Sequence, residues 1–161
     1  MSVGIASLLL LFLYSSTALA QSARRGQVEV RGLAGYSTFI DESFQDHFVA
    51  GGSGHYYLTR RFSVGPEFLA MYRPGFDHDI TAAAHFAWDF KGNSRVQPYV
   101  AGQLGVLRHF SRRFAVNSWS YGAGLGAKIA LTDRLSLVPD FRIGLEPILR
   151  ATVGVNYVVH R

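Results

Sequence analysis

The sequence predicts an all-β protein: an eight-stranded antiparallel up-and-down transmembrane β-barrel after an N-terminal signal peptide. Eight segments alternate apolar and polar residues with the period of two that marks a strand between two different environments. Short turns and longer loops alternate along the chain, which is typical of barrels that span an outer membrane. After residue 20, no apolar run approaches the roughly 20 residues that a membrane-spanning helix needs.

The predicted strands follow one another as hairpins, each long enough for the roughly 9 to 11 residues that a tilted membrane strand requires. They are residues 28–37, 47–58, 62–72, 79–90, 96–109, 118–131, 135–145 and 149–160. Turns are expected at 59–61, 91–94 and 132–134, and loops at 38–46, 73–78, 110–117 and 146–148. The even number of strands agrees with single-chain bacterial barrels.

In every segment the apolar residues fall mainly on one face. In chain order these faces hold Val28, Val30, Ala34 and Tyr36; Phe48, Ala50, Tyr56 and Leu58; Phe62, Val64, Pro66, Phe68, Ala70 and Tyr72; Ile80, Ala82, Ala84, Phe86, Trp88 and Phe90; Val100, Leu104 and Val106; Trp119, Tyr121, Leu125, Ile129 and Leu131; Leu135, Leu137, Phe141, Ile143 and Leu145; Leu149, Ala151, Val153, Val155, Tyr157 and Val159. The opposite faces are rich in glycine, alanine and serine and carry isolated charges.

This division predicts which face meets lipid. Small residues and a few charges suit the narrow interior of an eight-stranded barrel, whereas a wall facing water would carry many more Lys and Glu. The alternative is a soluble ligand-binding β-barrel, with its apolar face inside. Aromatic residues near the strand ends favour the membrane barrel, because they could form two interfacial girdles. They are Tyr36, Tyr56, Phe62, Tyr72, Trp88, Phe90, Trp119, Tyr121 and Tyr157.

The last strand, residues 149–160, has the most regular alternation, with Val158 as the one apolar residue on its polar face. A strand this regular at the C-terminus needs a partner. We expect it to pair antiparallel with residues 28–37 and so close the barrel.

The first 20 residues differ from the rest. An apolar run from Val3 to Tyr14 precedes Ala18-Leu19-Ala20, an A-x-A cleavage signal. We predict a signal peptide at 1–20, a short periplasmic lead at 21–27 and the barrel domain at 28–161. No Lys or Arg precedes the apolar run, so an uncleaved anchor is the alternative.

Composition narrows the function classes. The chain has no cysteine, which rules out disulfides and thiolate metal sites. Its formal net charge is +5 at pH 7, yet it has no basic helix pattern and no long run of Lys or Arg. A nucleic-acid partner is therefore not expected.

The polar face carries both signs of charge. Buried charges must be paired, so we expect a salt-bridge network that plugs the lumen. A narrow proton or ion path is the alternative, and His55 and His85 share the same face. The predicted network consists of Glu29, Arg31, Glu67, Lys128, Asp140, Arg142 and Arg150.

Three motifs carry a resemblance. They are Gln97-Pro98-Tyr99-Val100-Ala101-Gly102, Gly122-Ala123-Gly124-Leu125-Gly126, and the segment from Leu131 to Leu137 around the last turn. The mature chain resembles the small eight-stranded outer-membrane barrels typified by the OmpA transmembrane domain and OmpX. The resemblance implies a bacterial outer-membrane location and a final strand read by the barrel-assembly machinery. Thr152, Gly154, Tyr157 and Val159 fit that assembly signal, although the chain ends on His160-Arg161 and not on an aromatic residue.

Some barrels of this size modify lipid A, and His109-Phe110-Ser111 has the spacing of a base and a nucleophile. No acid to orient the histidine follows nearby, since the next one is Asp133 beyond a turn. We therefore expect no catalytic residue, no cofactor and no metal ligand. A lipid A-modifying enzyme is kept as an alternative function.

The loop after His109 is basic and aromatic. Arg108, Arg112 and Arg113 could contact lipopolysaccharide phosphates, because arginine forks match phosphate geometry. A solvated loop is the alternative. The expected function is that of a structural or surface, adhesion-type outer-membrane protein. Its expected partners are outer-membrane lipid and lipopolysaccharide, with the assembly machinery and periplasmic chaperones during insertion, and a monomer is expected.

Overall fold

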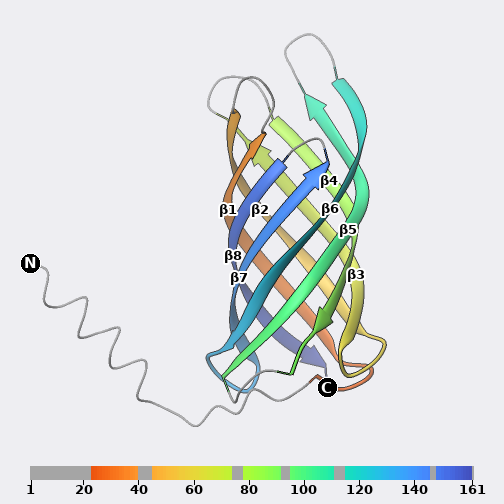
Figure 1. Ribbon diagram of the computed structural model, residues 1–161, viewed down its shortest axis with the longest axis vertical. Helices are drawn as coiled ribbons and strands as arrows, with labels where there is room; N and C mark the ends of the chain where they lie inside the picture. Colours follow the sequence, from red (N-terminus) through yellow and green to blue (C-terminus); the bar gives the residue numbers. More distant parts are fainter. Residues whose placement is uncertain are drawn as a thin grey trace, which may run out of the picture.

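The computed structural model describes residues 23–39, 45–73, 78–91, 95–110, 115–145 and 148–160. In these residues eight strands close into one barrel in chain order (Figure 1). They are β1 Val28–Phe39, β2 Gln45–Tyr57, β3 Phe62–Tyr72, β4 His78–Asp89, β5 Val96–Phe110, β6 Ala115–Ala130, β7 Leu135–Leu145 and β8 Ile148–His160. The predicted eight-stranded antiparallel barrel is confirmed.

All neighbouring strands pair antiparallel, and β1 pairs with β8 as expected. The closing ladder runs from Val28 opposite His160 to Phe39 opposite Ile148. Its register shifts between Val28 and Glu29, which lie opposite His160 and Val158, so β8 carries one extra residue there. Closure leaves no open sheet edge along this seam.

The two ends of the barrel differ. One end, called the turn end below, carries the connections β2–β3, β4–β5 and β6–β7 together with the start of β1 and the end of β8 (Figure 1). At the other, the loop end, the hairpin of β5 and β6 extends beyond β7, because the β6–β7 ladder begins only at Tyr121. Residues 1–20, the predicted signal peptide, lie outside the described residues.

Several predicted strands stop short of the observed strands at the loop end. β1 reaches Phe39 and β2 starts at Gln45, because these two residues still pair across the hairpin. Similarly, β6 starts at Ala115, which pairs with Phe110. The polar and aromatic residues taken as loop keep the extended conformation because the ladder beside them continues.

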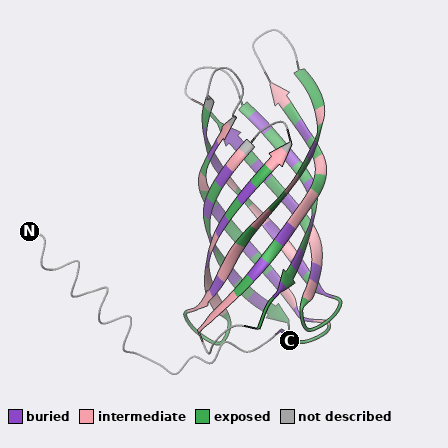
Figure 2. Ribbon diagram, viewed as in Figure 1, coloured by how far each residue is buried: buried purple, intermediate pink, exposed green. Residues whose placement is uncertain are grey.

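The outer wall is apolar, and the inner face carries most of the polar and charged residues of the strands. Buried and exposed residues alternate along the strands, most regularly in β4 (Figure 2). Phe68 is 59% exposed and Leu125 62%, whereas Glu67 and Asp89 are 0% exposed. This arrangement is the reverse of a water-soluble protein, so the alternative of a soluble ligand-binding barrel is wrong.

Exposed aromatic side chains lie near both ends of the wall. Tyr36, Tyr72 and Trp119 lie toward the loop end, and Trp88 and Tyr157 toward the turn end. Such belts are typical of residues at the two membrane–water interfaces. Within the described parts of the chain, no helix is long and apolar enough to cross a membrane.

Candidate functional site: the charged interior

All seven charged residues predicted for the interior are buried on the inner face, with exposures from 0% to 7%. Strand alternation places them there, since each follows an outward apolar neighbour. They do not form one cluster. Contacts among them and with further inner residues form two polar layers, one near the turn end and one at mid-height.

The layer near the turn end centres on Lys128 of β6. Its Nζ lies 2.9 Å from Asp89 Oδ2 and 3.3 Å from Glu29 Oε2, and it also contacts the Tyr57 hydroxyl. Tyr57 donates a 2.6 Å hydrogen bond to Asp89, and Asn156 donates one of 3.1 Å to Glu29. One cation thus faces two carboxylates, with neutral donors completing the layer.

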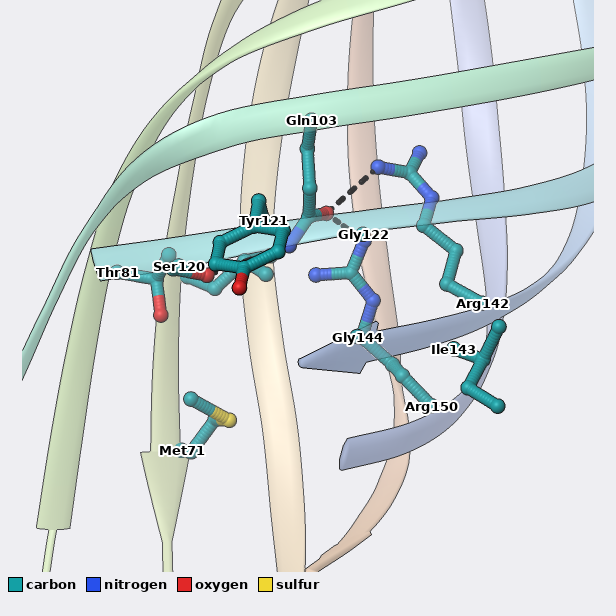
Figure 3. A pocket seen from close by; sticks show the side chains of 11 residues that line it. Met71, Thr81, Gln103, Ser120, Tyr121, Gly122, Arg142, Ile143, Gly144 and Arg150 are labelled. Carbon is teal, nitrogen blue, oxygen red and sulfur yellow. Dashed lines mark hydrogen bonds between the residues drawn. The ribbon is translucent and has the colours of Figure 1, made fainter. Parts of the chain in front are cut away.

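The central layer joins two arginines to shared acceptors. Arg142 Nε lies 2.8 Å from Asp140 Oδ1, and its Nη1 lies 3.2 Å from Glu67 Oε1. Arg150 Nη2 lies 3.0 Å from the same Glu67 oxygen. Both guanidinium groups also donate to Gln103 Oε1, at 2.9 and 3.1 Å (Figure 3).

Tyr99 connects this layer to β1. Its hydroxyl donates to Asp140 Oδ2 at 2.5 Å and accepts from Arg31 Nη1 at 3.2 Å. The guanidinium carbon of Arg31 lies 5.4 Å from the centre of the tyrosine ring. Arg31 is therefore held by a neutral hydroxyl and an aromatic face, a cation–π arrangement.

The two predicted lumen histidines lie beside the central layer. The rings of His55 and His85 meet edge to face, with centroids 4.6 Å apart. Arg142 donates to His85 Nε2 at 2.8 Å, and Ser53 Oγ lies 2.8 Å from His55 Nε2. In the part of the chain that the structure describes, no group of three or more His, Asp or Glu residues could hold a metal ion.

Toward the loop end the interior becomes apolar and then polar again. Leu33, Val49, Leu69, Met71 and Leu107 form a buried apolar cluster. One step further along the strands, three other inner residues meet. They are His47 on β2, Asp79 on β4 and His109 on β5. His109 Nδ1 lies 2.5 Å from Asp79 Oδ1, and His47 Nε2 lies 3.7 Å from Asp79 Oδ2.

Asp79 corrects one step of the sequence argument. The acid that could orient His109 was sought further along the chain, but it precedes His109 and is its direct cross-strand partner on β4. The turn predicted at 91–94 already implies that the strands carrying Asp79 and His109 are neighbours in one hairpin. Ser111, the nucleophile of the alternative lipid A-modifying function, lies outside the described residues.

Of the predicted lipopolysaccharide contacts, only Arg108 is described; Arg112 and Arg113 lie outside the described residues. Arg108 is exposed on the outer wall at the loop end. Its guanidinium carbon lies 5.0 Å from the centre of the Phe110 ring, which stacks on His78 with centroids 4.7 Å apart.

The assembly-signal residues divide between the faces of β8. Thr152 and Gly154 are buried on the inner face, whereas Tyr157 and Val159 are exposed on the wall.

Among the described residues, the predicted set omitted five side chains of these layers: Tyr57, Asp89, Tyr99, Gln103 and Asn156. Strand alternation put Tyr57, Asp89 and Gln103 on the polar face, so their position was available from the sequence. Their role was not, because partners come from strands that lie far apart in the chain.

Comparisons with known proteins agree with this architecture. The family model described as outer membrane protein beta-barrel domain matches residues 6–146. No curated protein sequence matches the chain.

Among solved structures, the N-terminal beta-barrel domain of Pseudomonas aeruginosa OprF is 16% identical, with a TM-score of 0.65, over 83% of this chain and 98% of that one. Neisserial surface protein A is 16% identical, with a TM-score of 0.65, over 81% and 95%. Ail, the attachment invasion locus protein of Yersinia pestis, is 14% identical, with a TM-score of 0.52, over 83% and 97%. At these identities the similarity establishes the fold alone.

Proposed function

The chain belongs to the family of outer membrane protein beta-barrel domains, and on this premise we propose that it is a structural barrel of the bacterial outer membrane with a plugged lumen. The proposal rests on contacts that cross the barrel interior. It assigns the charged network a mechanical role: it joins opposite walls and fills the space through which water and ions would pass.

One observation carries the proposal. In a closed barrel of eight strands, strands four apart lie on opposite walls. Glu67 on β3 meets Arg142 on β7 at 3.2 Å. Lys128 on β6 contacts Tyr57 on β2, and Arg31 on β1 bonds to Tyr99 on β5. Side-chain contacts thus bridge three of the four pairs of opposite strands.

Conductance across a planar lipid bilayer tests the plug. We expect the wild-type barrel to give no steady ion-selective current. Glu67→Ala removes the acceptor shared by Arg142 and Arg150, so measurable channel events in this variant would show that the plug also closes a path. Phe68→Ala, an adjacent change on the outer wall, is the matched control. Steady wild-type conductance would refute the plug.

A surface role at the loop end is the second part of the proposal. Arg108 and His78 are exposed on the outer wall and both contact the half-buried ring of Phe110, which forms a cationic and aromatic patch where phosphates of lipopolysaccharide would lie. Retention of lipopolysaccharide during purification should fall in a variant with Arg108, Arg112 and Arg113 changed to Ala. Arg134→Ala, in an exposed turn at the opposite end, should retain it. Equal retention in all three proteins would argue against the contact.

A lipid A-modifying hydrolase remains a second candidate function, favoured by one observation. The 2.5 Å contact of His109 with Asp79 supplies the orienting acid of a nucleophile–base–acid set. Expression of the wild-type protein would then shift the mass of lipid A, and Ser111→Ala would abolish the shift. An unchanged lipid A mass would leave the structural role alone.

Further proposals concern biogenesis. We propose that residues 1–20 are removed as a signal peptide and that the folded barrel is a monomer. We also propose that the assembly machinery recognises β8 and that periplasmic chaperones bind the nascent chain during insertion. The mass of the mature protein tests cleavage after Ala20. Light scattering of the detergent-folded protein, corrected for bound detergent, tests the monomer.

A further inference from the structure

A small cavity lies inside the barrel beside the last rungs of the β6–β7 ladder. Gly122 and Gly144 are cross-strand partners there, and both line the cavity. The cavity measures about 20 Å³. Its lining includes Thr81, Ser120 and Tyr121 on one side and two arginines on the other (Figure 3).

The charge of this lining is one-sided. Arg142 and Arg150 both border the cavity, and the described residues that line it include no Asp or Glu. Gln103 presents its carboxamide oxygen to the two guanidinium groups and donates from its nitrogen to Ser120 Oγ at 3.5 Å. The hydroxyl proton of Ser120 is consequently available to a further acceptor.

The two arginines differ in their carboxylate contacts, since Arg142 has two and Arg150 has one. Both arginines form an ion pair with the same oxygen, Glu67 Oε1. Asp140 forms an ion pair with Arg142 but not with Arg150. Arg150 is 4% exposed, and its buried Nε has no hydrogen-bond partner among the described residues. A buried donor of this kind calls for an acceptor, and a charged donor favours an anionic one.

We propose that the cavity is a binding site for one small monovalent anion of chloride size, held by Arg150 and Arg142 with the Ser120 hydroxyl as an additional donor. The size of the cavity sets the class of ligand. A site needs about 10–15 Å³ by this measure to hold one water molecule, so there is room here for a single compact ion. The anion supplies an acceptor for the buried Nε of Arg150.

Chloride itself is the probe for the test. The folded wild-type barrel in detergent should broaden the ³⁵Cl NMR signal, and bromide should compete for the broadening whereas gluconate at equal ionic strength should not. Arg150→Gln should reduce the apparent chloride affinity at least tenfold. Arg31→Met is the matched control: it removes another buried lumen arginine that does not line the cavity, and should keep the affinity.

A second variant guards against a folding defect in Arg150→Gln. Ser120→Val places extra carbon atoms in the cavity without touching an ion pair, and should also abolish the competable broadening. Absence of competable broadening in the wild type, meaning a bound water only, would overturn the proposal. Equal loss in Arg31→Met would overturn it too, since the effect would then follow total lumen charge. Neither result depends on whether the barrel conducts.

Discussion

At the scale of single residues, Tyr99 and Gly126 show how closely the interior of the barrel is packed. The two are cross-strand partners on β5 and β6. A β-carbon at Gly126 would lie 2.5 Å from Tyr99 Cζ and 2.7 Å from the Pro139 carbonyl oxygen. Glycine is therefore required here by close approach, because the tyrosine ring that bonds to Asp140 and Arg31 lies directly over it.

This contact predicts the effect of one methyl group. Gly126→Ala should lower the free energy of unfolding by about 1–3 kcal/mol, since the ring must shift and loosen its hydrogen bonds. Gly32→Ala is the control, because nothing lies within 4 Å of a β-carbon there. Urea titration of both variants in detergent micelles measures the difference. Equal destabilisation would contradict this account of Tyr99.

Lys128 gives the second prediction at this scale. Lys128→Met leaves Glu29 and Asp89 buried without their cation, which typically costs about 3–5 kcal/mol. Adding Glu29→Gln and Asp89→Asn should restore much of the stability, because no unpaired charge then remains. The same urea titration reports both. A triple variant no more stable than Lys128→Met would show that the packing of the lysine, and not its charge, matters.

The residues of the network were predictable only in part. Alternation alone placed Glu67 and Arg142 on the inner face, because the period of a strand is local. That they meet could not be inferred, since their contact depends on the tilt and stagger of the whole barrel. The contact of Asp79 with His109 was easier to infer from the sequence, because the two residues are partners within one hairpin.

At the scale of elements, the seam between β1 and β8 joins the two ends of the sequence. Val30 lies opposite Tyr157, and both side chains are exposed on the wall. Directly opposite residues in an antiparallel pair lie about 4.5–5.5 Å apart at Cα, within the range of a disulfide.

Because the chain has no cysteine, the seam can be tested by a single cross-link. Val30→Cys with Tyr157→Cys should oxidise to an intramolecular disulfide once the barrel is folded. Val30→Cys with Val155→Cys is the control, since a diagonal pair about 7–8 Å apart is too distant. Gel migration with and without reductant detects the bond. Preferential cross-linking of the control would indicate a different register.

The strand boundaries show which limits of the elements can be predicted from the sequence. β3 and β7 begin and end where predicted, because a short turn and an alternating pattern mark them. The loop-end limits of β1, β2 and β6 were missed, since Thr38, Phe39 and Asp46 resemble a loop in composition yet still pair. Pairing with a neighbour, and not local preference, keeps such residues extended.

At the scale of the whole molecule, closure and the apolar wall act together. Every strand has two neighbours, so the backbone groups of the described ladders pair within the barrel. Three side-chain contacts join opposite walls. We expect such a molecule to resist detergent, because its backbone polar groups are satisfied by neighbouring strands and no sheet edge is exposed.

This resistance predicts heat-modifiable gel migration. The detergent-folded protein should migrate differently when it is loaded unboiled and boiled, because only boiling opens the closed ladder. Extraction from membranes should likewise need detergent. Identical migration of both samples, after refolding has been verified by circular dichroism, would contradict a closed barrel.

The last prediction concerns the outer wall. The cost of a charged residue on this face depends on its depth in the membrane. Leu125 lies in the middle of the β6 wall and is 62% exposed, whereas Leu131 follows the strand at the turn end. In lipid vesicles, Leu125→Arg should lower the free energy of unfolding by about 2–4 kcal/mol, and Leu131→Arg by about 0–1 kcal/mol. A wall facing water would tolerate both arginines equally. Guanidinium titrations of the two variants in vesicles therefore separate lipid from water as the solvent of this face.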